Sequence, residues 1–413
     1  MAAPSPYEPR PTSDGVPRAI DGDPLSRAIA VRLPAALTTY ARTLLRWRPA
    51  CEIIVLREGR ETFPAMLAAL TTAKKSICLE VYILAADQTG QRFKDIMLER
   101  ARAGIAVRIM YDAVGSFGLA DSWFAELREV GAVVVAFNPI AVWRRRFRLS
   151  HRDHRKILVV DDEIAFIGGL NIANEYASTV DGGEGWHDMH CRVRGPAVLD
   201  LARLFRRTWI STGGTSYPAP GRASRAPGGP GTSFARVIEN TKLRQRGTFR
   251  RAYIHVIKCA TKSVLIENAY FLPERGVRRA LSLAVKRGVQ VGIIVPGSSD
   301  VKMVQYASDY ILRRLAKAGV EILHWQGSMM HAKTAVVDGT WSTIGSYNFD
   351  AQSRLNNLEV TLEVLDPIVG TEMITQFERD REHCTRYDEA AWLRLPWYRK
   401  VLAWVGYRMR RFL

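Results

Sequence analysis

One pattern of eighteen residues occurs twice in this 413-residue chain. The first copy, His154 to Asn171, reads HRKILVVDDEIAFIGGLN, and the second, His331 to Asn348, reads HAKTAVVDGTWSTIGSYN. Each has His-x-Lys, four residues, Asp, six residues and then Gly-small-x-Asn. A single His-x-Lys is common by chance, but two complete copies 177 residues apart are not. The pair therefore predicts a duplicated fold in which the two copies share one function.

The similarity between the two halves extends beyond these copies. Lys75–Glu80 (KSICLE) resembles Lys262–Glu267 (KSVLIE), and Leu127–Ala132 (LREVGA) resembles Leu315–Val320 (LAKAGV). Each half then runs into its own copy of the motif. A period this long excludes a solenoid of short repeats and indicates the duplication of a whole domain.

Strands alternate with helices in the first half. The expected strands are Ile53–Leu56, Ile77–Ile83, Val107–Asp112, Val133–Phe137, Ile157–Val160 and Ile164–Ile167, and the expected helices cover 63–74, 90–103, 121–130 and 196–210. This alternation favours an α/β fold. We therefore predict tandem duplicated domains, each a mixed β-sheet flanked by helices.

Length and local composition divide the chain into five parts. A chain of 413 residues is long enough for two domains. The expected parts are 1–48, a disordered start with a basic amphipathic segment; 49–210, the first domain; 211–232, a Gly/Pro/Ser linker; 233–385, the second domain; and 386–413, a basic aromatic tail.

The formal net charge of +18 indicates a polyanionic partner. Nucleic acid, an anionic membrane and phosphorylated substrates all fit, and a basic surface that only keeps the protein soluble is the alternative. Arg144, Arg145, Arg146 and Arg148 form a basic run just ahead of the first motif. The five cysteines are scattered without a CxxC pair, which fits buried thiols in a reducing compartment.

Two basic, aromatic segments favour a membrane surface among these partners. Residues 25–48 combine arginines with apolar residues at helical spacing, and residues 386–413 place Trp397 and Trp404 among basic residues. Packing on the domain is the alternative for the first segment, and stacking on nucleic-acid bases for the second. No apolar run approaches the ~20 residues of a transmembrane helix, and no secretory signal opens the chain. We expect contact with a bilayer from its surface.

The chemistry of the motifs fits phosphoryl transfer. That reaction needs a nucleophile, a proton donor for the leaving group, and cations around the phosphate oxygens. Two histidines can be the nucleophile and the general acid, while two lysines and two asparagines hold the oxygens. A His and a Lys two residues apart on a strand point to the same face. The candidate residues are His154, Lys156, Asn171, His331, Lys333 and Asn348. No residue cluster suggests a metal, and no cofactor is predicted.

Four acidic residues accompany these groups. A phosphorylated histidine must be oriented through its other ring nitrogen, usually by a carboxylate. Asp188 and Glu359 lie 34 and 28 residues downstream of the two motif histidines and are candidates by position, with surface or helix-cap acids as the alternative. The motif aspartates Asp161 and Asp338 complete the candidate catalytic set. Because they follow buried strands at turns, we expect them to tie down the turns rather than to touch substrate.

Both copies match the HKD signature of the phospholipase D superfamily, and the resemblance covers about residues 50–385. Within that superfamily the chain most resembles bacterial cardiolipin synthases of the short type without N-terminal transmembrane helices. The stretches that carry this resemblance are 154–176 (HRKILVVDDEIAFIGGLNIANEY), 267–273 (ENAYFLP) and 345–359 (GSYNFDAQSRLNNLE). The resemblance implies a pseudo-twofold pair of α/β domains with one shared site, and a metal-free, ping-pong transfer of a phosphatidyl group.

The resemblance also implies roles for individual residues. His154 is the nucleophile and His331 the acid and base, or the reverse, and Asp188 and Glu359 match the carboxylates that orient them. Ser346 contributes a hydroxyl near the phosphate. Gly169 departs from the pattern, because many members have Ser there, and it removes that hydroxyl on one side.

The expected reaction joins two molecules of phosphatidylglycerol into cardiolipin through a phosphohistidine and releases glycerol. The expected location is the cytoplasmic face of the cell membrane, where the protein is peripheral, and no nucleic-acid partner is expected. If water completes the reaction, the protein is a phospholipase D-type hydrolase. The sequence is also compatible with a metal-independent nuclease of the same superfamily and with a lipid-binding scaffold whose site is inactive. It does not indicate an oligomeric state.

Overall fold

The computed structural model describes residues 47–140, 150–215, 231–241, 245–299 and 301–410. The arginine run at 144–148, nearly all of the expected segment 1–48 and most of the expected linker 211–232 lie outside these ranges.

The first half alternates strands and helices as the sequence predicts. Its strands are β1 (Arg48–Arg57), β2 (Ser76–Val81), β3 (Ala106–Asp112), β4 (Val133–Phe137), β5 (Ile157–Val160), β6 (Ile164–Gly168) and β7 (Met189–Arg194). Its helices are α3 (Glu58–Thr71), α4 (Gln88–Arg102), α5 (Ala125–Glu129) and α6 (Ala197–Ser211), with 3₁₀ helices η1 (Asp121–Phe124), η2 (Asn174–Tyr176) and η3 (Thr179–Asp181). The expected helix over 121–130 is thus divided into η1 and α5.

The second half repeats this plan. Its strands are β8 (Ser233–Glu239), β9 (Ser263–Asn268), β10 (Gln290–Pro296), β11 (Glu321–Trp325), β12 (Lys333–Val337), β13 (Trp341–Gly345), β14 (Val360–Leu365) and β15 (Cys384–Arg386). Its helices are α7 (Thr248–Cys259), α8 (Arg275–Lys286), α9 (Lys302–Ala316), α10 (Ala351–Leu355) and α11 (Pro367–Glu382). Two further helices, α12 (Glu389–Arg394) and α13 (Trp397–Met409), follow β15.

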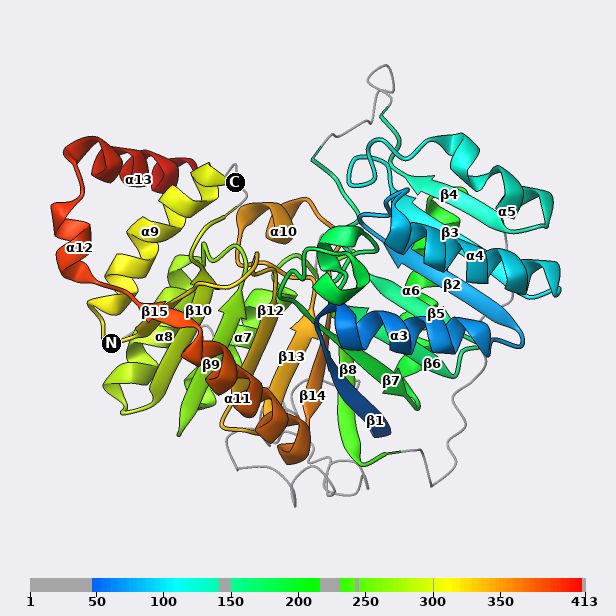
Figure 1. Ribbon diagram of the computed structural model, residues 1–413. Coiled ribbons are helices and arrows are strands. Elements are labelled where there is room, and N and C mark those ends of the chain that lie inside the picture. Colours follow the sequence, from blue (N-terminus) through cyan, green and yellow to red (C-terminus); the bar gives the residue numbers. More distant parts are fainter. Residues whose placement is uncertain (1–46, 141–149, 216–230, 242–244, 300, 411–413) are drawn as a thin grey trace, which may run out of the picture. The chain divides into compact units, whose positions relative to one another are not determined.

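All the described strands join one mixed sheet, in the order β15-β11-β10-β9-β12-β13-β14-β8-β1-β7-β6-β5-β2-β3-β4 (Figure 1). The antiparallel pair β1–β8 lies at its centre. Outward from this pair, each half has three antiparallel strands and then three strands that are parallel to one another. Apart from the additional edge strand β15, the order of neighbours is therefore the same on both sides. The chain has an α/β fold with two related segments in a mixed sheet.

Each motif forms a β-hairpin, β5–β6 in the first half and β12–β13 in the second. The turn residues Asp161 and Asp338 have positive φ angles of 57° and 53°. The Asp161 carboxylate accepts the backbone N–H groups of residues 74–76 at 2.7–2.8 Å. Asp338 accepts those of residues 261–263 at 2.8–2.9 Å. Both aspartates tie their turns to the start of a neighbouring strand, as the sequence predicts.

Alternate residues of the sheet face two different cores, as the pleat of a strand requires. Leu158 and Val160 of β5 pack in a core with α3 and α4, while Ile157 and Val159 face the core that contains α6. The second core continues into the other half, where it includes residues of β13, β14 and α11. The two halves therefore share one hydrophobic core in addition to the continuous sheet.

The expected tail is attached to the second half. Strand β15 pairs with β11, and α13 packs along α9 (Figure 1). A Cβ atom on Gly406 would lie 3.0 Å from the backbone nitrogen of Ala307, so the two helices touch closely there. The rings of Tyr407 and Tyr310 stack with centroids 4.5 Å apart. Within the described ranges, no helix combines the length and the apolar composition needed to cross a bilayer.

Candidate active site

Each motif histidine lies just before its motif strand, and a backbone hydrogen bond fixes it against the other half. The His154 N–H donates to the carbonyl of Leu358 at 3.0 Å, and the His331 N–H donates to the carbonyl of His187 at 2.7 Å. Both contacts belong to short parallel bridges between the halves. The two motifs therefore meet at the interface, as predicted.

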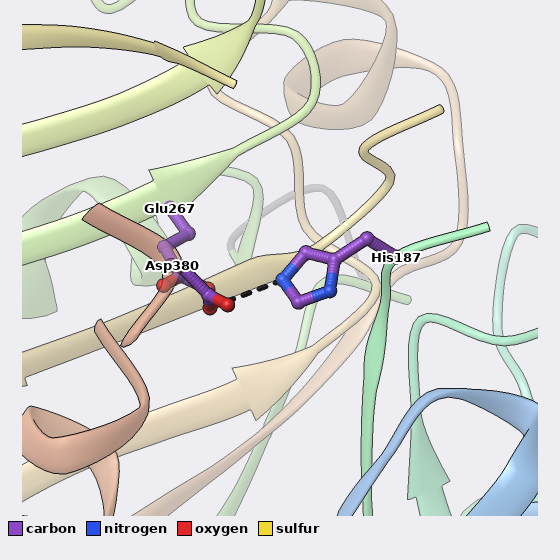
Figure 2. A group of neighbouring side chains, drawn as sticks. All are labelled: His187, Glu267 and Asp380. Carbon is purple, nitrogen blue, oxygen red and sulfur yellow. Dashed lines mark hydrogen bonds and ion pairs between the residues drawn. The ribbon is translucent and has the colours of Figure 1, made fainter. Parts of the chain in front are cut away.

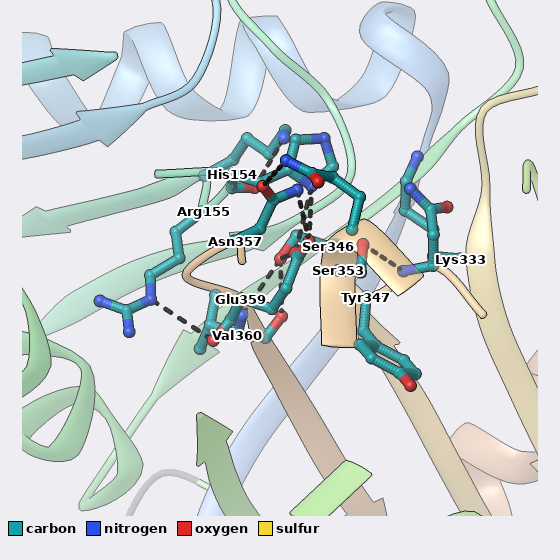
Figure 3. Close-up of polar contacts among 12 residues, drawn as sticks. His154, Arg155, Lys333, Ser346, Tyr347, Ser353, Asn357, Glu359 and Val360 are labelled. Carbon is teal, nitrogen blue, oxygen red and sulfur yellow. Dashed lines mark hydrogen bonds and ion pairs between the residues drawn. The ribbon is translucent and has the colours of Figure 1, made fainter. Parts of the chain in front are cut away.

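The carboxylates bind the histidines crosswise. His154 Nδ1 lies 3.1 Å from both carboxylate oxygens of Glu359, which belongs to the second half (Figure 3). His331 Nδ1 lies 2.7 Å from Asp188 Oδ2, which belongs to the first half. In both pairs Nδ1 faces the carboxylate, which leaves Nε2 for chemistry. Each half thus supplies one histidine and orients the histidine of the other half.

The two motif lysines are buried beside their histidines. Lys156 Nζ donates to the His154 carbonyl at 2.7 Å and lies 5.1 Å from the centre of the Tyr82 ring. Lys333 Nζ lies 2.7 Å from His331 Nδ1 and 3.6 Å from Asp188 Oδ2. Each motif thus places a buried lysine amine next to its own histidine.

Burial and mutual repulsion control protonation in this centre. Burial lowers the pKa of His154, and burial together with the charge of Lys333 lowers the pKa of His331 to about 4. Burial also lowers the pKa of Lys156 to about 7. Burial alone would raise the pKa values of Asp188 and Glu359, but the adjacent Lys and His groups hold them below their usual range. The ligand-free site therefore holds neutral imidazoles and ionised carboxylates.

The two sides differ at the small residue of the motif. The Ser346 hydroxyl donates to the Glu359 carboxylate and accepts the Val360 N–H at 3.1 Å (Figure 3). At the matching position, a Cβ atom on Gly169 would lie 2.2 Å from Asp188 Oδ1. The shorter aspartate occupies the space that a serine side chain would need. Gly169 is thus required by Asp188, and Ser346 supports Glu359.

The motif asparagines have different environments. Asn171 Nδ2 donates to the Tyr176 hydroxyl at 2.8 Å, and its Oδ1 accepts the Ile83 N–H at 3.1 Å. Asn348 Oδ1 is buried and has no hydrogen-bond partner among the described residues. Within the described ranges, Asn348 thus has an unpartnered acceptor, whereas both polar atoms of Asn171 have partners. Asp161 and Asp338 do not join the centre, because they lie at the opposite ends of β5 and β12 from the histidines.

Comparison with known proteins identifies the family. The family model described as "Cardiolipin synthase, PLD-like domain" matches residues 66–209 and 253–381. The chain belongs to this family. It is thereby a phosphatidyltransferase of the phospholipase D superfamily. Cardiolipin synthase of Alkalihalophilus pseudofirmus is 32% identical over 356 residues, which cover 85% of this chain and 70% of that protein. Cardiolipin synthase of Halalkalibacterium halodurans is 33% identical over 353 residues, covering 84% of this chain and 69% of the relative.

Solved structures share the fold of this cardiolipin synthase-family chain. Phosphatidylserine synthase of Haemophilus influenzae superposes with a TM-score of 0.65 at 16% identity, covering 92% of this chain and 98% of that one. Polyphosphate kinase of Porphyromonas gingivalis superposes with a TM-score of 0.56 at 16% identity, covering 82% and 49%.

Aromatic residues that the sequence analysis did not select form walls around the histidines. The Tyr82 ring meets the His154 ring edge-on at 5.0 Å, and the Tyr176 hydroxyl lies 3.3 Å from His331 Nδ1. The Trp186 ring lies 6.0 Å from the His331 ring. Tyr176 is the last residue of a stretch that carries the family resemblance, and Trp186 lies two residues before the candidate Asp188.

A buried ionic cluster supports the second half of the centre. His187 Nδ1 lies 3.0 Å from Glu58 and Nε2 lies 3.1 Å from Asp380, and Glu267 completes the group (Figure 2). Burial alone would lower the pKa of His187, but these two hydrogen bonds raise it to about 10. His187, Glu267 and Asp380 are the one described group with metal-ligand spacing. His187 pairs with Glu58 and Asp380 in this cluster.

Arg155 has the matching role in the first half. It is the variable residue of His-x-Lys, and it is fully buried. Its guanidinium lies 3.4 Å from Glu80 and donates to Thr208 Oγ1 at 2.8 Å. Glu80 and Glu267 are equivalent in the repeat, but the second motif has Ala332 in place of Arg155. His187 supplies the missing cation there.

Proposed function

We propose that this protein is a cardiolipin synthase that transfers a phosphatidyl group from one phosphatidylglycerol to another and releases glycerol. The observation that carries the proposal is the crossed pair of histidines, each oriented by a carboxylate of the other half, in a member of the cardiolipin synthase family. The route uses no cofactor, because the two lysines supply the positive charge that phosphoryl transfer requires.

In the first step, His154 Nε2 attacks the phosphorus of phosphatidylglycerol. A P–N bond forms, the P–O bond to the glycerol headgroup breaks, and His331 gives its proton to the leaving oxygen. Lys156 and Lys333 stabilise the phosphate oxygens, with Asn171 and Asn348 as further donors. The phosphate charge raises the low pKa of His331, which is how this imidazole acquires the proton it donates.

In the second step, a headgroup hydroxyl of another phosphatidylglycerol attacks the phosphohistidine. Its proton passes to His331, a new P–O bond forms, and the P–N bond to His154 breaks. Cardiolipin leaves and both histidines return to their starting states. Water in place of the hydroxyl would give phosphatidic acid, so the reaction depends on exclusion of water and binding of the second lipid.

We further propose that α12 and α13 lie on the cytoplasmic surface of the cell membrane. Trp397 and Trp404 are 75% and 52% exposed, and Leu393 is 57% exposed. Arg399, Lys400 and Arg408 accompany them on α13. Exposed aromatic residues beside cations suit the headgroup region of an anionic bilayer.

The proposal is tested with purified protein and vesicles of labelled phosphatidylglycerol in the presence of a chelator. Cardiolipin is the expected product, and phosphatidic acid alone would identify a hydrolase instead. Neither product, together with cleavage of plasmid DNA, would replace the lipid assignment with a nuclease. His154→Ala and His331→Ala should each reduce turnover by at least about 10³-fold. Near-normal turnover in either variant would exclude the two-histidine mechanism.

A further inference from the structure

The two halves differ at a helix start close to the catalytic centre. In the first half, Asp87 accepts a backbone N–H of the first turn of α4 at 2.8 Å and the Asn174 N–H at 2.6 Å. Glu274 occupies the equivalent position before α8 but makes no capping hydrogen bond. It pairs instead with Arg250, at 2.8 Å, and with Arg354. The N-terminus of α4 is thus capped by Asp87, whereas Glu274 before α8 forms ion pairs with arginines instead.

A cavity of about 210 Å³ lies beside Glu274. Its basic lining residues come from α7, α8, α10 and the end of α13, and they are Arg250, Arg275, Arg354 and Arg410. Two acidic residues, Glu274 and Asp350, oppose these four arginines, and burial raises the pKa of Asp350 to about 7. Among the described residues, no carboxylate contacts Arg275 or Arg410. The cavity therefore carries an excess of at least two positive charges. We call it the arginine cavity.

The surroundings of Tyr407 show the same excess of positive charge. Arg278 lies 3.4 Å from the Tyr407 hydroxyl, and the Arg410 guanidinium lies 4.0 Å from the centre of the ring. Burial would raise the pKa of this phenol, but the arginines lower it. An anion entering the arginine cavity would meet a positive potential that the protein itself leaves uncompensated.

The arginine cavity adjoins the segment that carries Asn348. Tyr347, Phe349 and Asp350, which flank the candidate substrate ligand Asn348, form one wall. Glu359 and Lys333 of the catalytic centre act electrostatically on the pKa of Asp350, so the cavity lies close to that centre. The lining also includes the apolar residues Leu272 and Val277. The cavity thus combines arginines with apolar side chains.

The repeat shows that the arginines do not serve the chemistry common to both halves. The backbone bridges Leu84–Ile172 and Phe271–Phe349 are equivalent and fix the correspondence around the cavity. Arg275 is the first residue of α8, and its counterpart Gln88 is the first residue of α4. In the other half, Phe63 corresponds to Arg250 and Ala177 to Arg354. The histidines, lysines and asparagines are duplicated, whereas these arginines are not.

We propose that the arginine cavity binds the phosphate of the acceptor phospholipid. The inference rests on the proposed function, in which two chemically distinct lipids meet at a nearly symmetric centre. Cardiolipin has two phosphates joined by one glycerol. The histidine–lysine centre holds one phosphate, and the second needs a cationic site nearby. Guanidinium groups bind phosphate oxygens with paired, charge-assisted hydrogen bonds, and the apolar lining suits the ester-linked part of a lipid.

Arg275→Gln provides the sharpest test. Arg275 is exposed, and among the described residues it pairs with no carboxylate, so the substitution leaves no carboxylate without a partner. Arg279→Gln is the matched control, an exposed arginine of the same helix outside the cavity. The full-length variants are assayed on phosphatidylglycerol vesicles for glycerol, cardiolipin and phosphatidic acid. In Arg275→Gln, the ratio of cardiolipin to phosphatidic acid should fall about three- to tenfold, with a similar rise in the KM for cardiolipin formation. Cardiolipin formation should fall more than glycerol release, and Arg275→Lys should recover part of the loss.

Several outcomes would overturn the assignment. A product ratio and KM equal to those of Arg279→Gln would show that the cavity does not hold the acceptor. Equal losses of glycerol release and cardiolipin would place the cavity in the first step. Inorganic phosphate, added at constant ionic strength, separates the phosphate sources: inhibition that Arg275→Gln abolishes while its KM is unchanged would identify a free-phosphate site. If the unmodified protein makes neither lipid product, the proposed function itself fails.

Discussion

At the scale of single residues, the protonation of Lys156 should govern the pH dependence of the reaction. Its lowered pKa, about 7, means that the free enzyme loses this positive charge as the pH rises through neutrality. We expect kcat/KM to fall more steeply above about pH 7, in addition to the fall caused by deprotonation of His331, whose pKa is about 4 in the free enzyme. A bound phosphate raises the pKa of the ammonium again, so kcat should decline only at higher pH. Initial rates across roughly pH 5.5–9.5, at low and at saturating lipid, would measure both profiles.

Lys156→Arg keeps the charge at all these pH values and should move the decline in kcat/KM upward. Lys156→Met removes the charge and should lower kcat/KM by about 10²- to 10³-fold. A decline near pH 7 that persists in Lys156→Arg would assign it to another group.

His187 should stabilise the folded protein as an imidazolium. Its folded-state pKa, about 10, lies above the unfolded value of about 6.5. The stabilisation is therefore complete below about pH 6.5 and is lost as the pH rises through about 10. His187→Gln should reduce the free energy of unfolding by about 3–5 kcal/mol at pH 6, and by much less at pH 10. Urea denaturation at both values tests this, with the partly exposed His255→Gln as control. The His187 ring also stacks on the Trp325 ring, with centroids 4.5 Å apart. A loss of stability that does not depend on pH would mean that His187 acts through this packing rather than through its charge.

At the scale of elements, the outer side of α12 and α13 should bind anionic vesicles. Replacing Trp397 and Trp404 with serine removes two exposed aromatic anchors and should weaken binding to phosphatidylglycerol vesicles by about tenfold or more. Sedimentation with vesicles measures this. Ile368→Ser removes another residue that is 75% exposed, from α11, and serves as control. Unchanged binding in the tryptophan variant would leave packing on α9 as the role of these helices.

The regular elements and the motif groups were predictable from sequence, but the partners across the interface were not. Periodicity located β5 and β6 to within one residue because both are short, apolar and bounded by polar turns. Nothing local to Asp188 indicates that it binds His331 rather than His154, since the pairing depends on how the halves meet. The roles of Ser346 and Gly169 depend on the lengths of Glu359 and Asp188, and these become visible only in three dimensions.

At the scale of the whole molecule, duplication explains both the likeness of the halves and their inequality. Crossed carboxylates make each half incomplete by itself, because its histidine lacks an orienting partner. Arg155 and His187 each place a cation beside one of the equivalent glutamates Glu80 and Glu267, but they come from different positions in the repeat. Arg250, Arg275 and Arg354 of the arginine cavity have no counterpart arginines in the first half. In the proposed reaction, which uses a donor lipid and an acceptor lipid, this asymmetry would give the two lipids different binding groups.

The shared core makes a further prediction about stability. Strands β1 and β8 join the halves into one sheet, and buried residues of both halves pack in one cluster. The described halves should therefore unfold together, in a single calorimetric transition. Leu362→Ala, in the buried face of β14, removes side-chain contacts from this core and should cost about 2–5 kcal/mol. Because the halves are coupled, the whole transition should move to lower temperature. If instead the transition splits, with one part at the original temperature, the first half has a stability of its own, and the core connects domains that fold independently.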